Sequence, residues 1–331
     1  MNRPGQRHER GTASEVVETG QACGKAILLG EHAVVYGIPA LAVGIERGVR
    51  AIATSCAGAS RLAVPGWGVE VAAGDRSDLG CALAALVEAS ELATSLAIEA
   101  TVDLPPGGGL GCSAALGVAV ARAIDPASDP ETIAARVMAW ERIFHGNPSG
   151  VDAAVASCGG CVEFTKGEGA APARIEPVRL AVPLTVCIGH SGKSSSTVAM
   201  VEAVARLRTE RPQRVKEAFD AIRTLVRTGR RALEWGDRAS LGRLMDMNQM
   251  WLSALRLSTP AIDDLCRLAR DHGAYGAKLT GAGGGGCVVA LVNGVAGAKH
   301  VLQGWRAAGF EGFATRVAPA NVELEDIVES A

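Results

Sequence analysis

Apolar and polar positions along the first half of the chain follow two periods, which predict strands and helices in turn. Short apolar runs bounded by glycine or charged residues predict buried strands at 26–29, 41–45, 51–53 and 98–104. Arg47 and Gly48 separate the second of these runs from the third. Apolar residues at helical spacing predict helices at 78–96, 113–124 and 132–144, and a further apolar segment starts at 153–156. The helix at 113–124 is apolar nearly all round, so it should lie inside a domain.

The second half of the chain favours longer helices and a second set of strands. Thr259 and Pro260 form a strong helix start, with threonine as the cap and proline in the first helical position. The elements predicted here are, in chain order, a strand at 184–188, helices at 197–208, 213–235, 238–256 and 261–271, strands at 276–280 and 287–292, a helix at 296–307 and a strand at 313–317. This order predicts an α+β protein with a polar, disordered tail (1–14) and two domains (15–182 and 183–331).

Composition narrows the classes of protein that the chain can represent. Its 331 residues are enough for about two domains with a sizeable core. Lys and Arg number 33 against 35 for Asp and Glu, so no field of one sign is available to hold nucleic acid. No apolar stretch is long enough to span a bilayer, and the N-terminus lacks the apolar region of a secretory signal. Nine cysteines, an odd number, favour reduced thiols and a cytoplasmic location.

The strongest chemical signal is the segment PPGGGLGCSAA at residues 105–115. Consecutive glycines leave backbone N–H groups open to a polyphosphate, and the N-terminus of the following helix adds donors and a partial positive charge. Ser113 in the first turn offers a hydroxyl to a metal ion or a phosphate oxygen. A flexible surface loop is the alternative, but four glycines and two prolines before a wholly apolar helix favour a phosphate loop.

Other charged residues stand near these predicted elements. Glu141 stands at a helix end, and Asp152 follows a Gly/Pro loop. One of these carboxylates could bind Mg²⁺, and the other could accept the proton of a substrate hydroxyl. Taken alone, such residues more often form a solvated face and a helix cap. Lys25 precedes a buried strand, where a lysine needs a partner, and Glu31 and His32 follow the same strand. A lone histidine without a second one at metal-binding spacing is more often structural.

Three motifs compete with this interpretation. Residues 281–286 satisfy G-x-G-x-x-G, but a strand follows them, whereas a dinucleotide site must open a helix. Cys158 and Cys161 have CxxC spacing without a second pair to complete a zinc site. The segment 184–194 has a strand and GKS in the order of a P-loop, although Cys187 replaces its first glycine. The last motif supports a rival class, a P-loop NTPase that would use Lys193.

Four segments together resemble the motifs of the GHMP kinase superfamily, and within it most closely those of the mevalonate kinases. GKAILLGEHAVVYG (24–37) resembles the first motif, PPGGGLGCSAA (105–115) the second and KLTGAGGGGC (278–287) the third. HGNPSGVD (145–152) discriminates best, because it resembles mevalonate kinases more than other members of the superfamily. These segments run from residue 24 to residue 287, so the resemblance is global.

The resemblance implies a fold, an activity and a set of site residues. The fold would be two-domain α+β, with an N-terminal domain like ribosomal protein S5, a ferredoxin-like C-terminal domain and the active site in the cleft between them. The activity would be ATP- and Mg²⁺-dependent phosphorylation of the primary hydroxyl of mevalonate, with phosphomevalonate or a sugar as alternative substrates. A catalytically silent binding protein should lose the base or the metal ligands, which remain here. A homodimer is the assembly that this resemblance allows, with no nucleic acid or membrane partner.

Residue roles are carried over by position within the motifs. Asp152 matches the catalytic base and Lys25 the lysine beside it, which would favour the ionised carboxylate and make proton transfer late. The remaining roles fall to Gly107, Gly108, Gly109, Leu110, Gly111, Cys112 and Ser113 for ATP, Ser113 and Glu141 for Mg²⁺, and Lys25, Glu31, His32 and Thr197 for the substrate.

The chain departs from the family pattern at two places. Cys112 stands where the first of two serines is usual, and His190-Ser191 stands where many mevalonate kinases carry Asp-Thr. On this interpretation, 192–197 is a loop on the substrate side. The glycine loop of the third motif would be a structural approach to the cleft.

Overall fold

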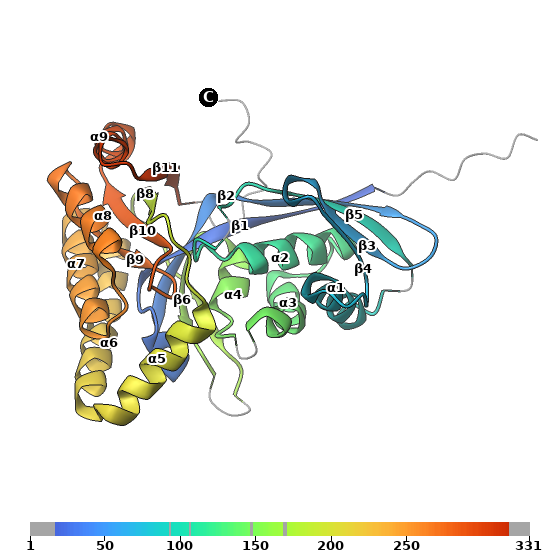
Figure 1. Ribbon diagram of the computed structural model, residues 1–331, viewed down its shortest axis with the longest axis horizontal. Coiled ribbons are helices and arrows are strands. Elements are labelled where there is room, and N and C mark those ends of the chain that lie inside the picture. Colours follow the sequence, from blue (N-terminus) through green and yellow to red (C-terminus); the bar gives the residue numbers. More distant parts are fainter. Residues whose placement is uncertain (1–16, 93, 106, 146–147, 168–170, 318–331) are drawn as a thin grey trace, which may run out of the picture.

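The first half of the chain folds into a seven-stranded sheet around one long antiparallel strand pair (Figure 1). The computed structural model describes residues 17–317 except 93, 106, 146–147 and 168–170, so the predicted tail 1–14 lies outside the described residues. The strands are β1 (Val17–Leu29), β2 (Ala40–Ser55), β3 (Arg61–Val64), β4 (Val69–Ala72), β5 (Leu96–Val102), β6 (Cys161–Thr165) and β7 (Arg174–Pro177). Their order is β4-β3-β5-β2-β6-β7, and β1 pairs with β2.

Helices cover one face of this sheet, as Figure 1 shows. They are α1 (Asp78–Ala89), α2 (Cys112–Ile124), α3 (Pro130–His145) and α4 (Val151–Cys158), and two short 3₁₀ helices, η1 (Ala33–Tyr36) and η2 (Pro65–Trp67), lie in connections. Helix α2 packs against β1 and β2 and is buried along most of its length, which confirms its prediction as an internal helix. Its position carries the predicted phosphate loop to the end of β1.

The second half forms a four-stranded antiparallel sheet with long helices. The strands are β8 (Thr185–His190), β9 (Gly276–Thr280), β10 (Cys287–Val292) and β11 (Glu311–Arg316), in the order β11-β8-β10-β9. The helices are α5 (Thr197–Glu210), α6 (Pro212–Trp235), α7 (Arg238–Ala254), α8 (Pro260–Asp271) and α9 (Gly294–Ala307). The predicted start of α8 is confirmed, because Thr259 Oγ1 accepts a hydrogen bond of 3.3 Å from the Ile262 amide.

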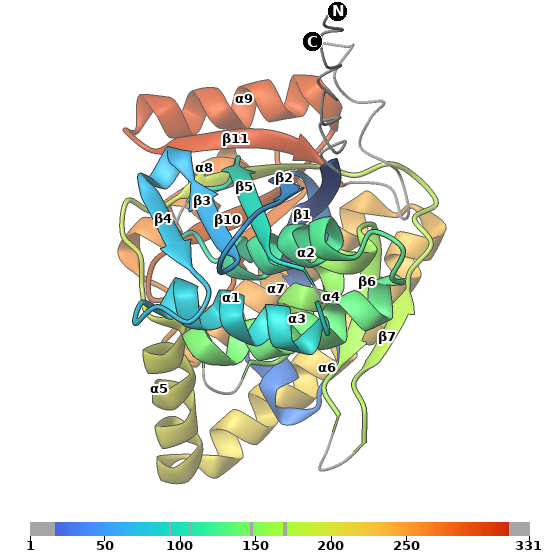
Figure 2. The ribbon, with the colours of Figure 1, turned by 90° about the vertical axis from the view of Figure 1, so that its right-hand side faces the viewer.

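The two sheets meet along β2 and β11, which lie close together in Figure 2. Arg316 Nε forms an ion pair with Glu46 Oε1 at 2.9 Å, and the Arg47 guanidinium lies 4.1 Å from the centre of the Phe313 ring. The first sheet ends at Pro177 and the second begins at Thr185. The predicted domain boundary at 182/183 falls in this connection and stays a prediction.

Two predictions of local structure are wrong, and four short strands were not predicted. The runs at 41–45 and 51–53 belong to one strand, β2, because its pairing with β1 continues past Arg47 with a shift of register near Cys23 and Gly24. The helix predicted over 78–96 ends at Ala89, after which Glu91 takes a left-handed φ of 51°. The short strands β3, β4, β6 and β7, which pair as the hairpins β3-β4 and β6-β7, were not predicted, because each has only four or five residues and a brief apolar run.

Two further observations bear on the class of protein. Within the described residues, no helix is both long and apolar enough to cross a membrane. All nine cysteines are free thiols, as their number indicated.

Candidate active site

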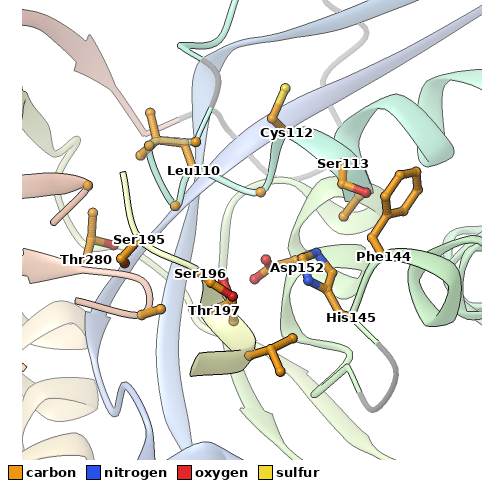
Figure 3. Close-up of a pocket in the computed structure, with 18 of the residues that line it drawn as sticks. Leu110, Cys112, Ser113, Phe144, His145, Asp152, Ser195, Ser196, Thr197 and Thr280 are labelled. Atoms are coloured by element: carbon orange, nitrogen blue, oxygen red, sulfur yellow. The ribbon is translucent and has the colours of Figure 1, made fainter. Parts of the chain in front are cut away.

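Two adjoining cavities lie where the two halves of the molecule meet. The larger, of about 330 Å³, is lined by the glycine loop 107–111, by α2 and α3, and by residues 195–198 and 280–286 of the second half (Figure 3). The smaller, of about 100 Å³, is lined by the end of β1, by η1 and by α5. Four residues line both cavities: Gly109, Asp152, Thr197 and Ala282. The predicted base therefore stands at the junction of the two cavities.

Asp152 and Lys25 form an ion pair at this junction. Lys25 Nζ lies 3.0 Å from Asp152 Oδ1, and the exposed fractions of the two side chains are 4% and 31%. Strand β1 places the lysine, and the first turn of α4 places the aspartate. The pair gives the buried lysine the partner that the sequence required, and it leaves part of the carboxylate open to the cavity.

The glycine loop is fastened to the same strand. The Lys25 amide donates a 2.9 Å hydrogen bond to the Leu110 carbonyl. Gly111 has a left-handed φ of 72°, and a Cβ there would lie 2.9 Å from Lys25 Cγ, so this position requires glycine. Within the described part of the chain, the N–H groups of residues 107–113 find no protein acceptor. They line the larger cavity at the N-terminus of α2, an arrangement that suits phosphate oxygens.

Ser113, in the first turn of α2, and the buried Glu141, in α3, form a pair beside the glycine loop. Ser113 Oγ donates a 2.7 Å hydrogen bond to Glu141 Oε1, and the Trp140 indole N–H donates to the Ser113 carbonyl at 3.1 Å. Burial, and then the charge of Asp152, raises the pKa of Glu141 to about 7. Trp140 was not predicted as a site residue, although a buried indole next to a candidate ligand needs a hydrogen-bond partner.

The donor set of Ser113 and Glu141 fits Mg²⁺. Both supply oxygen, and a cation there would offset the charge that burial disfavours on Glu141. No group of three or more His, Cys, Asp or Glu side chains that could hold a metal occurs within the described residues. Mg²⁺ at substrate sites characteristically takes few protein ligands and completes its shell with phosphates and water.

His145 and Phe144 also line the larger cavity, beside Asp152, and neither was assigned a role from the sequence. His145 Nε2 lies 3.8 Å from Glu141 Oε2, and burial lowers the pKa of the imidazole. Figure 3 shows Ser113, Phe144 and His145 to the right of Ser195, Ser196 and Thr197, with Asp152 between the two groups. Gly146 and Asn147 of the same motif lie outside the described residues.

Glu31 and His32 line the smaller cavity, and both carboxylate oxygens of Glu31 and the Nε2 atom of His32 are engaged within the protein. Glu31 forms a buried ion pair with Lys278, and burial raises the pKa of its carboxyl. His32 Nε2 lies 2.7 Å from the Ala282 carbonyl, to which it donates, and burial lowers the pKa of the ring to about 4. Both side chains therefore connect the first motif to the third.

The P-loop alternative does not fit this structure. Strand β8 lies between β10 and β11 in an antiparallel sheet, whereas a P-loop follows a strand of a parallel sheet. Lys193 is exposed. Neither Lys193 nor His190 nor Ser191 belongs to the described lining of either cavity. The His190 ring instead accepts a hydrogen bond of 3.0 Å from the Gly192 amide.

Comparisons with known proteins agree with the motifs. Residues 79–160 match the protein family described as "GHMP kinases N terminal domain", and residues 209–311 match the family described as "GHMP kinases C terminal". A mevalonate kinase of Pyrococcus abyssi is 32% identical, over 92% of this chain and 97% of its own length. One of Methanothermobacter thermautotrophicus is 33% identical, over 80% and 87%.

Solved structures give the same result. The crystal structure of L. major mevalonate kinase in complex with R-mevalonate has a TM-score of 0.77 and 25% identity, over 93% of this chain and 98% of its own. A Lactococcus lactis galactokinase, at 19% identity and a TM-score of 0.71, shares the fold. The two-domain α+β architecture expected from the motifs is thus confirmed. The chain belongs to the GHMP kinase superfamily and, within it, to the family of the mevalonate kinases.

Proposed function

We propose that this protein transfers the γ-phosphoryl group of ATP to the primary hydroxyl of mevalonate, which yields 5-phosphomevalonate. The observation that carries the proposal is the position of Asp152, paired with Lys25 at the junction of a larger and a smaller cavity. A base at such a junction can face an alcohol on one side and a polyphosphate on the other. The mevalonate kinases to which the chain is similar support this choice of substrate.

The two cavities differ in the ligands that they suit. The larger is lined by the free N–H groups of residues 107–113 and accommodates the phosphates of ATP. The smaller combines apolar walls from Val34, Val35 and Val201 with Lys25 and Thr197, which suits a short, branched hydroxy acid. Its described lining includes no arginine and no lysine other than Lys25, which disfavours a substrate that already carries a phosphate.

In the proposed reaction, Asp152 accepts the proton of the substrate hydroxyl as the oxygen bonds to phosphorus. Phosphoryl transfer passes through a loose transition state, so orientation of the alcohol contributes more than its early deprotonation. The ion pair with Lys25 holds the carboxylate in place, and the ammonium lies where it can also offset charge on the transferring group. The leaving oxygen remains with ADP.

The charge on the phosphates is offset mainly by backbone donors. The N–H groups of residues 107–113 and the N-terminus of α2 point their partial positive charge at the larger cavity. Ser113 and Glu141 would hold Mg²⁺, which supplies electrostatic stabilisation of the phosphate oxygens. We propose Lys25, His32 and Thr197 as substrate-side residues, together with a cytoplasmic location and a homodimeric assembly.

A substrate panel tests the proposed function. ADP formation should be measured with mevalonate, phosphomevalonate and galactose at equal concentrations, each with and without Mg²⁺. We expect Mg²⁺-dependent ADP formation with mevalonate alone. If ADP forms faster with phosphomevalonate or galactose, the proposed substrate is wrong. If ADP forms equally fast without any alcohol, the reaction is ATP hydrolysis and not phosphoryl transfer to mevalonate.

A further inference from the structure

A lysine and a glutamate that the mechanism does not use are paired in the interior between the two sheets. Lys278 lies in β9 and Glu31 directly follows β1, and both side chains have no exposed surface. The ammonium also donates to the Ile27 carbonyl at 3.3 Å, and Asn248 Nδ2 donates to Glu31 Oε2 at 3.4 Å. Both carboxylate oxygens therefore have protein partners, which leaves Glu31 poorly placed to bind a substrate.

The pair belongs to a set of contacts between the first and third motifs. Lys278 and Thr280 lie two residues apart in β9, so their side chains point to the same side of the strand. Thr280 Oγ1 accepts a 2.8 Å hydrogen bond from the Ile27 amide, while Lys278 donates to the Ile27 carbonyl. Two side chains from β9 thus satisfy both backbone groups of one residue on β1. A third contact between the two motifs is the hydrogen bond from His32 to the Ala282 carbonyl, just after β9.

These contacts act on the strand that carries Lys25. Ile27 lies two residues after Lys25, so the backbone amides of both residues point away from β2. The Ile27 amide donates to Thr280 Oγ1, and the Lys25 amide donates to the Leu110 carbonyl. Fixing Ile27 therefore also fixes the backbone from which the lysine reaches Asp152.

The pair also separates charges inside the site. Lys25 and Lys278 both act electrostatically on Glu31, but only Lys278 bonds to it, while Lys25 bonds to Asp152. Without Lys278, Glu31 would be a buried carboxylate with no ion-pair partner, still under the electrostatic influence of Lys25. Such a carboxylate is strongly destabilising until it gains a proton or a new partner.

We infer that Lys278 is a positioning residue: by occupying Glu31, it keeps the Lys25 ammonium on Asp152 and locks β9 to the end of β1, and Glu31 serves this lock rather than the substrate. The inference rests on the proposed function. It assigns the third motif a share in catalysis that its glycines alone do not carry.

The test uses four variants of the full chain. These are Lys278→Met, Glu31→Gln, the double variant and Arg136→Met, which breaks a 2.8 Å ion pair with Asp125 away from the cavities. For each, kcat, the KM values for mevalonate and ATP, and the melting temperature are measured. We expect Lys278→Met to lower kcat by about 100-fold, the loss that a small misplacement of a reacting group produces. Arg136→Met should lower only the melting temperature.

The double variant decides the role of Glu31, even if Lys278→Met fails to fold. Because it removes both buried charges, it should fold, keep the KM for mevalonate within about threefold and recover kcat to within about tenfold of the wild type. A rise of 30-fold or more in that KM would make Glu31 a substrate ligand and overturn the inference. Full kcat in a folded Lys278→Met would also overturn it. Absence of turnover by the wild type with mevalonate would instead overturn the proposed function.

Discussion

The two glycine-rich loops of the cavity have similar compositions and opposite uses of their backbone. Residues 107–111 lead into helix α2, and their N–H groups find no acceptor within the described part of the chain. Residues 281–286 lead into strand β10, and their polar groups are largely engaged. The Gly284 and Gly286 amides each donate at 2.7 Å to carbonyls of neighbouring segments, and the Ala282 carbonyl accepts from His32.

The difference shows that glycine serves two purposes here. In the first loop it removes side chains from a surface that must face a ligand. In the second it lets the backbone approach other segments closely: a Cβ on Gly283 would lie 2.5 Å from the Leu257 carbonyl oxygen. The element that follows each loop, a helix or a strand, separates the two purposes.

The largest effect should come from the group that the first loop faces. Asp152→Asn should lower kcat by about 10²–10⁴-fold, the contribution of a positioned base, and leave the affinity for ATP nearly unchanged. Steady-state kinetics with mevalonate, together with calorimetric titration of an ATP analogue, measures the two effects. Near-normal kcat would show that the base lies elsewhere.

Gly111→Ala should affect catalysis more than stability. The new Cβ would lie only 2.9 Å from Lys25 Cγ. The alanine would also have to keep the left-handed φ of this position, which costs about 1–2 kcal/mol. Displacement of the lysine and of the loop should reduce kcat/KM by about 100-fold. Kinetics beside a melting curve measures this, with Lys193→Ala as the exposed-loop control. Equal losses in both variants would contradict the distinction between the loops.

Gly283→Ala should show the opposite balance. Close approach to the Leu257 carbonyl oxygen and a φ of 75° should lower the free energy of unfolding by about 2–4 kcal/mol. The folded fraction should keep kcat within about threefold, because the second loop binds other segments rather than phosphate. Urea unfolding and kinetics on the soluble protein give the two quantities. Lost turnover at unchanged stability would give this loop a direct part in the chemistry.

Glu141→Gln should stabilise the protein when Mg²⁺ is removed. The folded pKa of about 7 lies above the ordinary value of 4.5, so the folded state holds this proton more tightly. The resulting loss of stability is absent below pH 4.5, grows between pH 4.5 and 7, and is complete above pH 7, at about 3 kcal/mol. Melting temperatures in EDTA across this range should therefore fall less in the variant. Parallel curves would contradict a strained carboxylate at this position.

Most of the fold could be predicted from patterns within single elements. Helix α2 and strand β10 were predicted because their burial shows in nearly uniform apolar runs. The continuity of β2 could not be, since Glu46 and Arg47 become compatible with a strand only by contacting β11.

The site shows the same limit. The pairing of Lys25 with Asp152 followed from the motifs, and a buried lysine predicts that it has a partner. Which partner Lys278 takes depends on a packing between sheets that no local pattern records, and so does the engagement of Glu31. Trp140 and His145 were not predicted as site residues for a related reason: their part in the site depends on how helix α3 packs beside α2 and the larger cavity.

The contacts between Ile27 and β9 join residues separated by about 250 positions. During synthesis, the ribosome completes the loop that faces ATP and the aspartate opposite it long before it makes Lys278 and Thr280. Until those residues emerge, the edge of β1 near Ile27 lacks the side chains that satisfy it. A nascent chain that stops before residue 276 would thus carry every predicted catalytic residue and still lack the strand that holds them in register.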